Sequence, residues 1–154
     1  MTSQKSDAGV TGVTMSLEVH IVPVSDVERS KQFYQRLGWR LDEDVSPAKD
    51  LRIVQFTPPG SGCSVVFGTG LSEAEPGSAE AALIVSDIKA AHAELIRRRI
   101  GVTEMWHGAP FPLEARLPGP DPLRTSYGSF FAFGDPDGNA WLVQEVTTRR
   151  PGRG

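Results

Sequence analysis

The chain has 154 residues, 39% of them hydrophobic, and a formal net charge of -3. This length is enough for one full hydrophobic core, and the charge provides no basic surface for nucleic acid or for a membrane. The single cysteine, Cys63, excludes a disulfide framework or a cysteine zinc cluster within one chain and favours a reducing cytoplasm. No apolar run approaches the roughly 18 residues of a membrane span, and residues 1–15 are expected to form a disordered leader.

The first half of the ordered chain predicts the order β-α-β-β-β. Residues 17–24 are rich in β-branched side chains and predict a strand, after which Ser25-Asp26 is a helix N-cap signal. An apolar stripe then predicts a helix that ends at Gly38. Further strands are expected at 39–41, 51–56 and 63–67. We therefore expect a first module over residues 16–68, followed by a linker over 69–78 that is rich in Gly, Ser, Glu and Pro.

The same pattern restarts after the linker. A strand is predicted at 81–85, Ser86-Asp87 is the next cap signal, and a helix is expected from residue 88 to Gly101. Three more strands are expected at 102–106, 129–133 and 140–146, the last one after the tight turn Asp-Pro-Asp-Gly. The second module therefore spans residues 79–147, and a basic tail follows over 148–154.

The two halves form an internal repeat. Val24-Ser25-Asp26-Val27 and Val85-Ser86-Asp87-Ile88 are nearly the same tetrapeptide, 61 positions apart (85 minus 24). Each stands between a predicted strand and a predicted helix. One such unit leaves a sheet face open, so two units packed together can curl into a shared cup. We expect an α+β fold with helices outside and the ligand site in the cup.

A long loop over residues 107–128 interrupts the second module. It has many prolines and no regular period, and loops of this length are usually functional or disordered. We interpret it as a lid over the cup, with a disordered insertion as the alternative. Trp106 and His107 at its start, and Arg124 and Tyr127 at its end, would bind an anionic or aromatic ligand at the mouth of the cup, unless they are merely solvated.

Three features together resemble one known family. They are the doubled strand, Ser-Asp cap and helix, the stretch F-Y-Q-R-L-G-W at 33–39, and the closing D-P-D-G-N-A-W-L-V-Q-E at 135–145. They are similar to the vicinal oxygen chelate superfamily, which includes glyoxalase I, extradiol dioxygenases and bleomycin-resistance proteins. The resemblance covers residues 17–146 and implies two βαβββ modules that form a U-shaped mixed sheet. Because this fold serves several chemistries, it indicates function only weakly.

Enzymes of that family hold a divalent metal with His and Glu side chains at equivalent points of the two modules. The resemblance places these points at Val19, Val65, Glu80 and Leu142. Three of the four are aliphatic and have no lone pair, and one carboxylate cannot hold the metal against water. His20 is adjacent, but successive strand residues face opposite sides, so we expect it to face the helices. We therefore expect no metal and no other cofactor.

Glu80 is the most interesting single residue in this alignment. Desolvation in an apolar cup would raise its pKa and prepare it to act as a general base or as a hydrogen-bond acceptor. The alternative is a solvated member of the linker's acidic run. Gln144 and Gln55 would place amides in the cup, where they orient a ligand or satisfy backbone groups.

The leading hypothesis is a bleomycin-resistance-like protein, cytoplasmic and homodimeric, that binds a small, partly apolar organic molecule without a metal. The alternative is an enzyme: a metal-independent isomerase or lyase that uses Glu80 as base or, less favoured, a metal-dependent glyoxalase- or dioxygenase-like enzyme. Nucleic acid and membrane are not expected as partners. Besides Glu80, the expected ligand-binding residues are Val19, Gln55, Val65, Trp106, His107, Arg124, Tyr127, Leu142 and Gln144.

Overall fold

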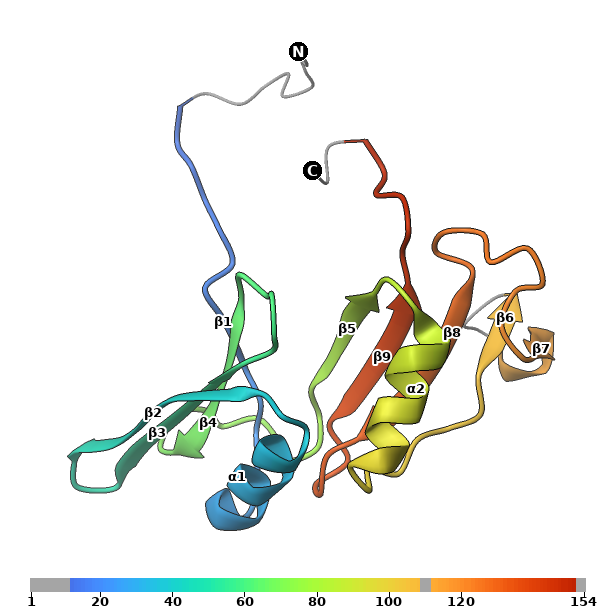
Figure 1. The fold of residues 1–154 in the computed structure, drawn as a ribbon. Coiled ribbons are helices and arrows are strands. Elements are labelled where there is room, and N and C mark those ends of the chain that lie inside the picture. Colours follow the sequence, from blue (N-terminus) through green and yellow to red (C-terminus); the bar gives the residue numbers. More distant parts are fainter. Residues whose placement is uncertain (1–11, 109–111, 152–154) are drawn as a thin grey trace.

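The computed structural model describes residues 12–108 and 112–151, and its elements form two successive groups (Figure 1). The first group contains β1 (Val19–Ile21), α1 (Val27–Arg36), β2 (Arg40–Ala48), β3 (Leu51–Thr57) and β4 (Ser64–Thr69). The second contains β5 (Glu80–Val85), α2 (Ile88–Arg97), β6 (Trp106–Gly108), the 3-10 turn η1 (Leu113–Ala115), β7 (Arg116–Pro118), β8 (Ser129–Gly134) and β9 (Ala140–Glu145). Most of the predicted leader, the end of the basic tail and three residues of the 107–128 loop lie outside the described residues.

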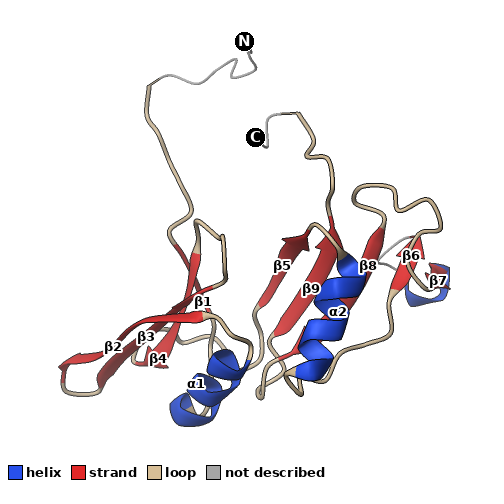
Figure 2. Cartoon of the chain, viewed as in Figure 1, coloured by secondary structure: helices blue, strands red, loops and turns tan. Residues whose placement is uncertain are grey.

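Each group forms an open mixed sheet, which confirms the predicted α+β fold class (Figure 2). The strand order is β1-β4-β3-β2 in the first sheet and β5-β9-β8-β6-β7 in the second. In each module the first strand pairs in parallel with the last, β1 with β4 and β5 with β9, and the other strand pairs are antiparallel. Two short edge strands, β1 and β5, therefore stand at corresponding places in the two sheets.

Both helices begin at the aspartates that the sequence marks as caps. The Asp26 side chain accepts from the backbone N–H of Arg29, and the Asp87 side chain accepts from those of Lys89 and Ala90. These bonds satisfy donors that the first helical turn leaves open. The predicted ends differ: Gly38 follows α1 with a φ of 86°, but after α2 the left-handed residue is Arg99, with a φ of 64°. Gly101 therefore does not end α2.

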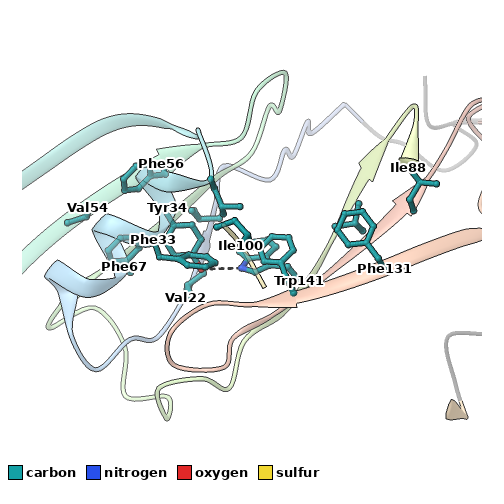
Figure 3. Close-up of a cluster of buried hydrophobic side chains, with 14 residues drawn as sticks. Val22, Phe33, Tyr34, Val54, Phe56, Phe67, Ile88, Ile100, Phe131 and Trp141 are labelled. Atoms are coloured by element: carbon teal, nitrogen blue, oxygen red, sulfur yellow. Dashed lines mark hydrogen bonds between the residues drawn. The ribbon is translucent and has the colours of Figure 1, made fainter. Parts of the chain in front are cut away.

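The core is one cluster that joins the helix-covered faces of both sheets (Figure 3). Tyr34 of α1 lies at its centre, with its ring 5.4 Å from that of Phe67 in the first sheet. The Tyr34 hydroxyl accepts from Trp141 Nε1 of the second sheet at 3.1 Å and donates to the Asp135 carboxylate at 2.9 Å. Burial raises the pKa of Tyr34, so the phenol stays protonated. The two modules are therefore fastened through one aromatic side chain.

The turn between β8 and β9 fastens them a second time. Asp135 and Asn139 are buried, and the Asn139 amide donates to the backbone oxygen of Pro23 and to Asp135. The Asn139 oxygen accepts from the backbone N–H of Ala79. Gly77 lies against this turn so closely that a Cβ atom added to it would stand 2.2 Å from the backbone oxygen of Asp137. Only glycine fits there, which explains one small residue of the linker.

Three strands differ from the prediction. β2 continues to Ala48 rather than ending at residue 41, although its sequence is mainly polar. Its Asp44 is bonded to Lys31 of α1 and Arg52 of β3, so ion pairs replace the apolar alternation that predicts a strand. Val102 forms only an isolated bridge, and β7 lies inside the predicted loop. Among the described residues, no helix is long and apolar enough to cross a membrane.

Candidate functional site

Each sheet has one face toward the helices and one face away from them, which we call the cup face. In the first sheet, Phe56 and Phe67 contact Tyr34 of α1, and in the second sheet Phe131 contacts His92 of α2. Because side chains alternate along a strand, the residues beside these aromatics belong to the cup face. The cup face therefore includes Val19, Gln55, Ser64 and Val66 in the first sheet. In the second sheet it includes Glu80, Ala82, Phe130, Ala132, Leu142 and Gln144.

A cavity of about 310 Å³ lies between the edge strands β1 and β5, and we call it the seam pocket. Val19 and Val65 line it from the first module and Glu80 from the second, so the structure brings together three of the predicted site residues. Most of the remaining wall is aliphatic, with Leu17, Pro58, Ala82 and Leu83 among the lining residues. Its volume is in the range of small-molecule sites.

The register corrects one predicted position on β4. Val65 pairs with Phe56 and belongs to the core cluster, so its side chain is on the helix face of β4, although it still borders the seam pocket. Val19 of β1 pairs with Ser64 of β4 in the same way that Glu80 of β5 pairs with Ala140 of β9. Two residues after these partners lie Val66 on β4 and Leu142 on β9. The counterpart of Leu142 is therefore Val66. The sequence places this point in the strand at 63–67, but the residue within that strand depends on the pairing with β1.

His20 faces the helices, as predicted. Its ring meets Trp141 edge-on with centroids 6.3 Å apart, and its Nε2 is a buried atom without a hydrogen-bond partner among the described residues. His20 therefore cannot replace the missing imidazole of a metal site on the cup face.

Glu80 stands at the start of β5 on the cup face, where it borders the seam pocket and a second pocket of about 360 Å³. Its side chain is exposed. The desolvation that the predicted base required is therefore absent in the single chain. What Glu80 supplies at this point is an accessible carboxylate between two largely apolar hollows.

The second pocket lies on the cup face of the second sheet. Leu142 and Ala132 line its floor, and Trp106 and Arg116 form one side. Trp106 stacks on Phe130 with centroids 5.6 Å apart, and the Arg116 guanidinium carbon lies 3.7 Å from the Trp106 ring centre. Arg116 belongs to β7, a strand that the sequence did not predict, so this contact was missed.

The two predicted amides lie on the cup face, but each is already engaged. Gln144 Nε2 donates to the backbone oxygen of Tyr127 at 2.9 Å. Gln55 Nε2 lies 3.5 Å from the Asp42 carboxylate. Both interactions are consistent with the structural alternative, in which the amides satisfy protein groups.

Of the four residues predicted at the mouth of the cup, Trp106 faces the cup and the other three are bonded to protein groups. Trp106 faces the cup, but His107 faces the other way, and its Nδ1 lies 2.8 Å from the backbone oxygen of Gly119. The guanidinium of Arg124 is paired with the buried carboxylate of Glu145, which raises the pKa of Arg124. The Tyr127 hydroxyl accepts from the backbone N–H of Arg150, a bond that lowers the pKa of Tyr127.

Residues 107–128 are therefore not a free lid over the cup in their described part. Residues 106–108 and 116–118 pair as antiparallel strands that extend the second sheet. Arg124 and Tyr127 both have left-handed backbone angles, with φ of 52° and 72°, and both are held against β9. Phe111 of this loop lies outside the described residues.

A polar chain on the cup face of the first sheet was not predicted. The Thr57 hydroxyl donates to the Asp42 carboxylate and lies 2.6 Å from the Ser64 hydroxyl. Thr57 and Ser64 are both buried, and Ser64 also lines the seam pocket. Side chains alternate along a strand, so Thr57 next to Phe56 and Ser64 three residues before Phe67 are both expected on the face opposite these aromatics. Nothing in the sequence pairs the two hydroxyls with Asp42.

The donor set does not fit the divalent metal that the fold family implies. At the four corresponding points stand Val19, Val66, Glu80 and Leu142. Three aliphatic side chains offer no lone pair to a cation. Within the part of the chain that the structure describes, no group of three His, Cys, Asp or Glu side chains is arranged to hold a metal.

Comparisons with known proteins agree with this fold. A family model described as "Bleomycin resistance protein-like N-terminal" matches residues 19–46. TnmS3, an antibiotic binding protein from Streptomyces sp. CB03234, is 28% identical, with 89% of this chain and 99% of that chain covered and a TM-score of 0.66. A glyoxalase/bleomycin resistance protein from the same organism is 30% identical, with 84% and 100% covered and a TM-score of 0.62.

A third solved structure extends the range of organisms. A member of the glyoxalase/bleomycin resistance protein/dioxygenase superfamily from Sphaerobacter thermophilus DSM 20745 is 27% identical, with 86% of this chain and 98% of that chain covered and a TM-score of 0.64. None of the curated proteins that were compared matches the chain.

Proposed function

Because this chain belongs to the glyoxalase/bleomycin resistance protein superfamily, we propose that it binds a small, partly apolar organic molecule on its cup face without a metal. The observation that carries the proposal is the pair of largely apolar pockets that meet at Glu80, beside points where a metal would find Val19, Val66 and Leu142. The similarity to an antibiotic binding protein supports an antibiotic-like ligand.

The proposal includes a cytoplasmic homodimer. Ile21 and Ile84 lie on the cup faces of the two edge strands and are 45% and 47% exposed. A second chain packed against these edge strands would bury both side chains. Cys63 is free, which fits a reducing compartment. Sedimentation of the purified protein tests the dimer.

Two measurements test the binding function. Elemental analysis of untagged protein should find no stoichiometric divalent metal, and a stoichiometric metal would contradict the metal-free proposal. Protein-observed NMR with the neutral probe 2-naphthylmethanol should shift the amide signals of Val19, Ala82 and Leu142.

A blocking variant makes the binding test specific. Ala82 is exposed on the cup face and borders both pockets, so Ala82→Arg should abolish the shifts without unfolding the protein. Ala93→Arg is the matched control, because Ala93 is an exposed alanine on α2. Equal shifts in both variants, or no shifts in the unmodified protein, would contradict binding on the cup face.

An enzymatic role remains the second candidate, and it depends on Glu80. Glu80→Gln keeps the shape of the side chain but removes its basicity. A base-dependent isomerase or lyase would lose its activity in this variant, while binding of 2-naphthylmethanol would be retained.

A further inference from the structure

The seam pocket is bordered by more polar side chains than its apolar walls suggest. They are Glu80, Ser61, Ser64, Cys63, His20 and Trp141. A polar atom in a site recognises a ligand through the hydrogen or the lone pair that the protein leaves unused. The direction of each hydrogen bond around the pocket therefore determines which ligand groups it can bind.

The direction of one chain of bonds follows from a carboxylate. Hydrogen bonds from Arg40 and Thr57 hold the pKa of Asp42 below its usual value, so Asp42 is ionised and only accepts. The single hydroxyl hydrogen of Thr57 goes to Asp42. Thr57 must therefore accept from Ser64, whose hydroxyl lies 2.6 Å away. Ser64 is left with lone pairs and without a free hydrogen.

Three further hydrogens at the pocket are also donated to the protein. The Ser61 hydroxyl donates to the backbone oxygen of Cys63 at 2.7 Å. The Cys63 thiol donates to the backbone oxygen of Ser64, and Trp141 Nε1 donates to Tyr34. None of these groups retains a hydrogen for a ligand.

The remaining polar side chains are a charged acceptor and an imidazole. Glu80 is exposed and accepts through its carboxylate. His20 also borders the pocket, and its Nε2 is a buried atom. Among the described residues that line this pocket there is no Lys or Arg. The seam pocket thus presents oxygen lone pairs and a negative charge within an aliphatic wall.

We propose that the seam pocket selects ligands that carry a protonated amine on an apolar body, with the amine bonded to Ser64 Oγ and the Glu80 carboxylate. This inference rests on the proposed small-molecule binding and specifies its ligand class. An ammonium group has three hydrogens and no lone pair, so it complements the Ser64 hydroxyl and the Glu80 carboxylate, which can only accept. A carboxylate ligand would meet lone pairs and the charge of Glu80. A hydrogen bond to a charged group is also stronger than one between two neutral groups.

The second pocket gives a contrast within the same molecule. There Arg116 lies against Trp106, so the protein itself supplies the cation. The described lining of the second pocket has no hydroxyl, whereas the seam pocket has Ser61 and Ser64, whose hydrogens are donated to the protein.

Three probes with one naphthalene ring test the inference in the intact protein. They are 2-naphthylmethylamine, 2-naphthylmethanol and 2-naphthoate, which are cationic, neutral and anionic at neutral pH. Titration followed by NMR should give the amine an affinity about tenfold higher than that of the alcohol, the ratio expected for one additional charge-assisted bond. The naphthoate should bind most weakly. Equal or tighter binding of the naphthoate would overturn the inference while leaving the proposed function intact.

Two variants identify the groups responsible. Ser64→Ala and Glu80→Gln should each weaken the amine probe by about tenfold and weaken the alcohol probe less, because the alcohol has one neutral hydrogen to donate. Glu80 is exposed, so Glu80→Gln does not threaten folding. An unchanged preference for the amine in Glu80→Gln would overturn the assignment. If the alcohol probe does not bind the unmodified protein either, the proposed function itself fails.

A third variant tests the direction of the bonds. Thr57→Val removes the acceptor of the Ser64 hydrogen and frees that hydrogen for a ligand. The preference for the amine should therefore fall while the naphthoate gains affinity, which loss of packing alone would not produce. Thr69→Val is the matched control, because Thr69 is exposed at the far end of β4 and does not line the pocket. Naphthoate affinity that stays unchanged in Thr57→Val would contradict the bond direction.

Discussion

The two modules repeat one topology, but their cup faces differ. At corresponding points of the parallel ladders, Ser64 beside Val19 in the first module matches Ala140 beside Glu80 in the second. The first sheet carries a hydrogen-bonded chain from Asp42 to Ser64, whereas the second carries stacked aromatics. The helix faces, in contrast, are apolar in both modules. The fold is therefore set by one face of each sheet, and the other face is free to take up different chemistry.

The closing turns of the two modules differ as well. The turn between β3 and β4 is exposed at Gly60 and Ser61, and its side-chain bonds stay within the turn. The turn between β8 and β9 reaches back to the first module through Asn139 and through Asp137, which accepts from Ser25. Equivalent turns thus have unequal roles: among the described residues, the second turn is hydrogen-bonded to the other module, whereas the side-chain bonds of the first stay within the turn.

Removing the Asn139 amide should cause the largest loss of stability. Asn139→Ala deletes the bonds to Pro23, Asp135 and Ala79 and leaves buried backbone groups without partners. At about 1–3 kcal/mol for each unsatisfied group, the free energy of unfolding should fall by roughly 3–5 kcal/mol. Urea denaturation measures the change.

The first module provides the matched comparison for this loss. Ser61→Ala in the corresponding turn should change the free energy of unfolding by less than about 1 kcal/mol, because Ser61 is exposed. Similar losses in both variants would contradict the unequal roles of the two turns.

The next largest effect is expected at Glu145, whose carboxylate is 1% exposed. It accepts from the backbone N–H of Ile88 and from Arg124, and the pairing with Arg124 lowers the pKa of Glu145. Glu145→Gln should reduce the free energy of unfolding by about 1–2 kcal/mol at neutral pH, because Arg124 is partly solvated. Thr69, the corresponding residue of the first module, is exposed, so Thr69→Val should have a much smaller effect.

The pH dependence of this loss separates charge from packing. Glu145 has a folded-state pKa below its ordinary value of 4.5, so its stabilisation is full above about pH 4.5. It is lost as the pH falls toward the folded-state pKa. Denaturation curves of the unmodified protein and Glu145→Gln should therefore converge as the pH falls below 4.5. A constant difference across this range would show that shape, rather than charge, is responsible.

The helix faces and caps were predictable from the sequence because they follow local rules. Apolar periodicity, Asp26 and Asp87 as caps, and the closing turn all depend on neighbours in the chain. The sequence predicts too short a β2 because this strand is stabilised by ion pairs with other elements rather than by alternating apolar side chains. The sequence contains those charges but does not show which of them meet.

The candidate site was less predictable because it depends on register and on long-range pairing. The sequence favours Val65 as the metal point of β4, whereas the pairing with β1 puts Val66 there. Arg124 looks like a ligand contact in the sequence, yet its partner Glu145 lies 21 positions further along the chain. The direction of the Thr57 and Ser64 bonds needs the position of Asp42, which no local pattern provides.

The smallest effect is expected in the ion pairs of the first module. Asp44 of β2 is bonded to Lys31 of α1 at 2.7 Å and to Arg52 of β3 at 2.8 Å. The hydrogen bond from Arg52, and to a smaller extent the one from Lys31, lowers the pKa of Asp44. These side chains are 22–26% exposed, in contrast to the buried carboxylate of Glu145. Asp44→Asn should therefore reduce the free energy of unfolding by only about 1 kcal/mol.

Salt decides whether the charges of this network are responsible, because pairs that are partly solvated are screened at high ionic strength. The loss in Asp44→Asn should shrink in about 1 M sodium chloride, where the Debye length is about 3 Å, while the loss in Glu145→Gln should persist. If both losses respond to salt alike, the contrast between a solvated network in the first module and a buried pair in the second is wrong. If only the first responds, the two modules stabilise the same topology by physically different means, which is the condition under which their cup faces can diverge independently.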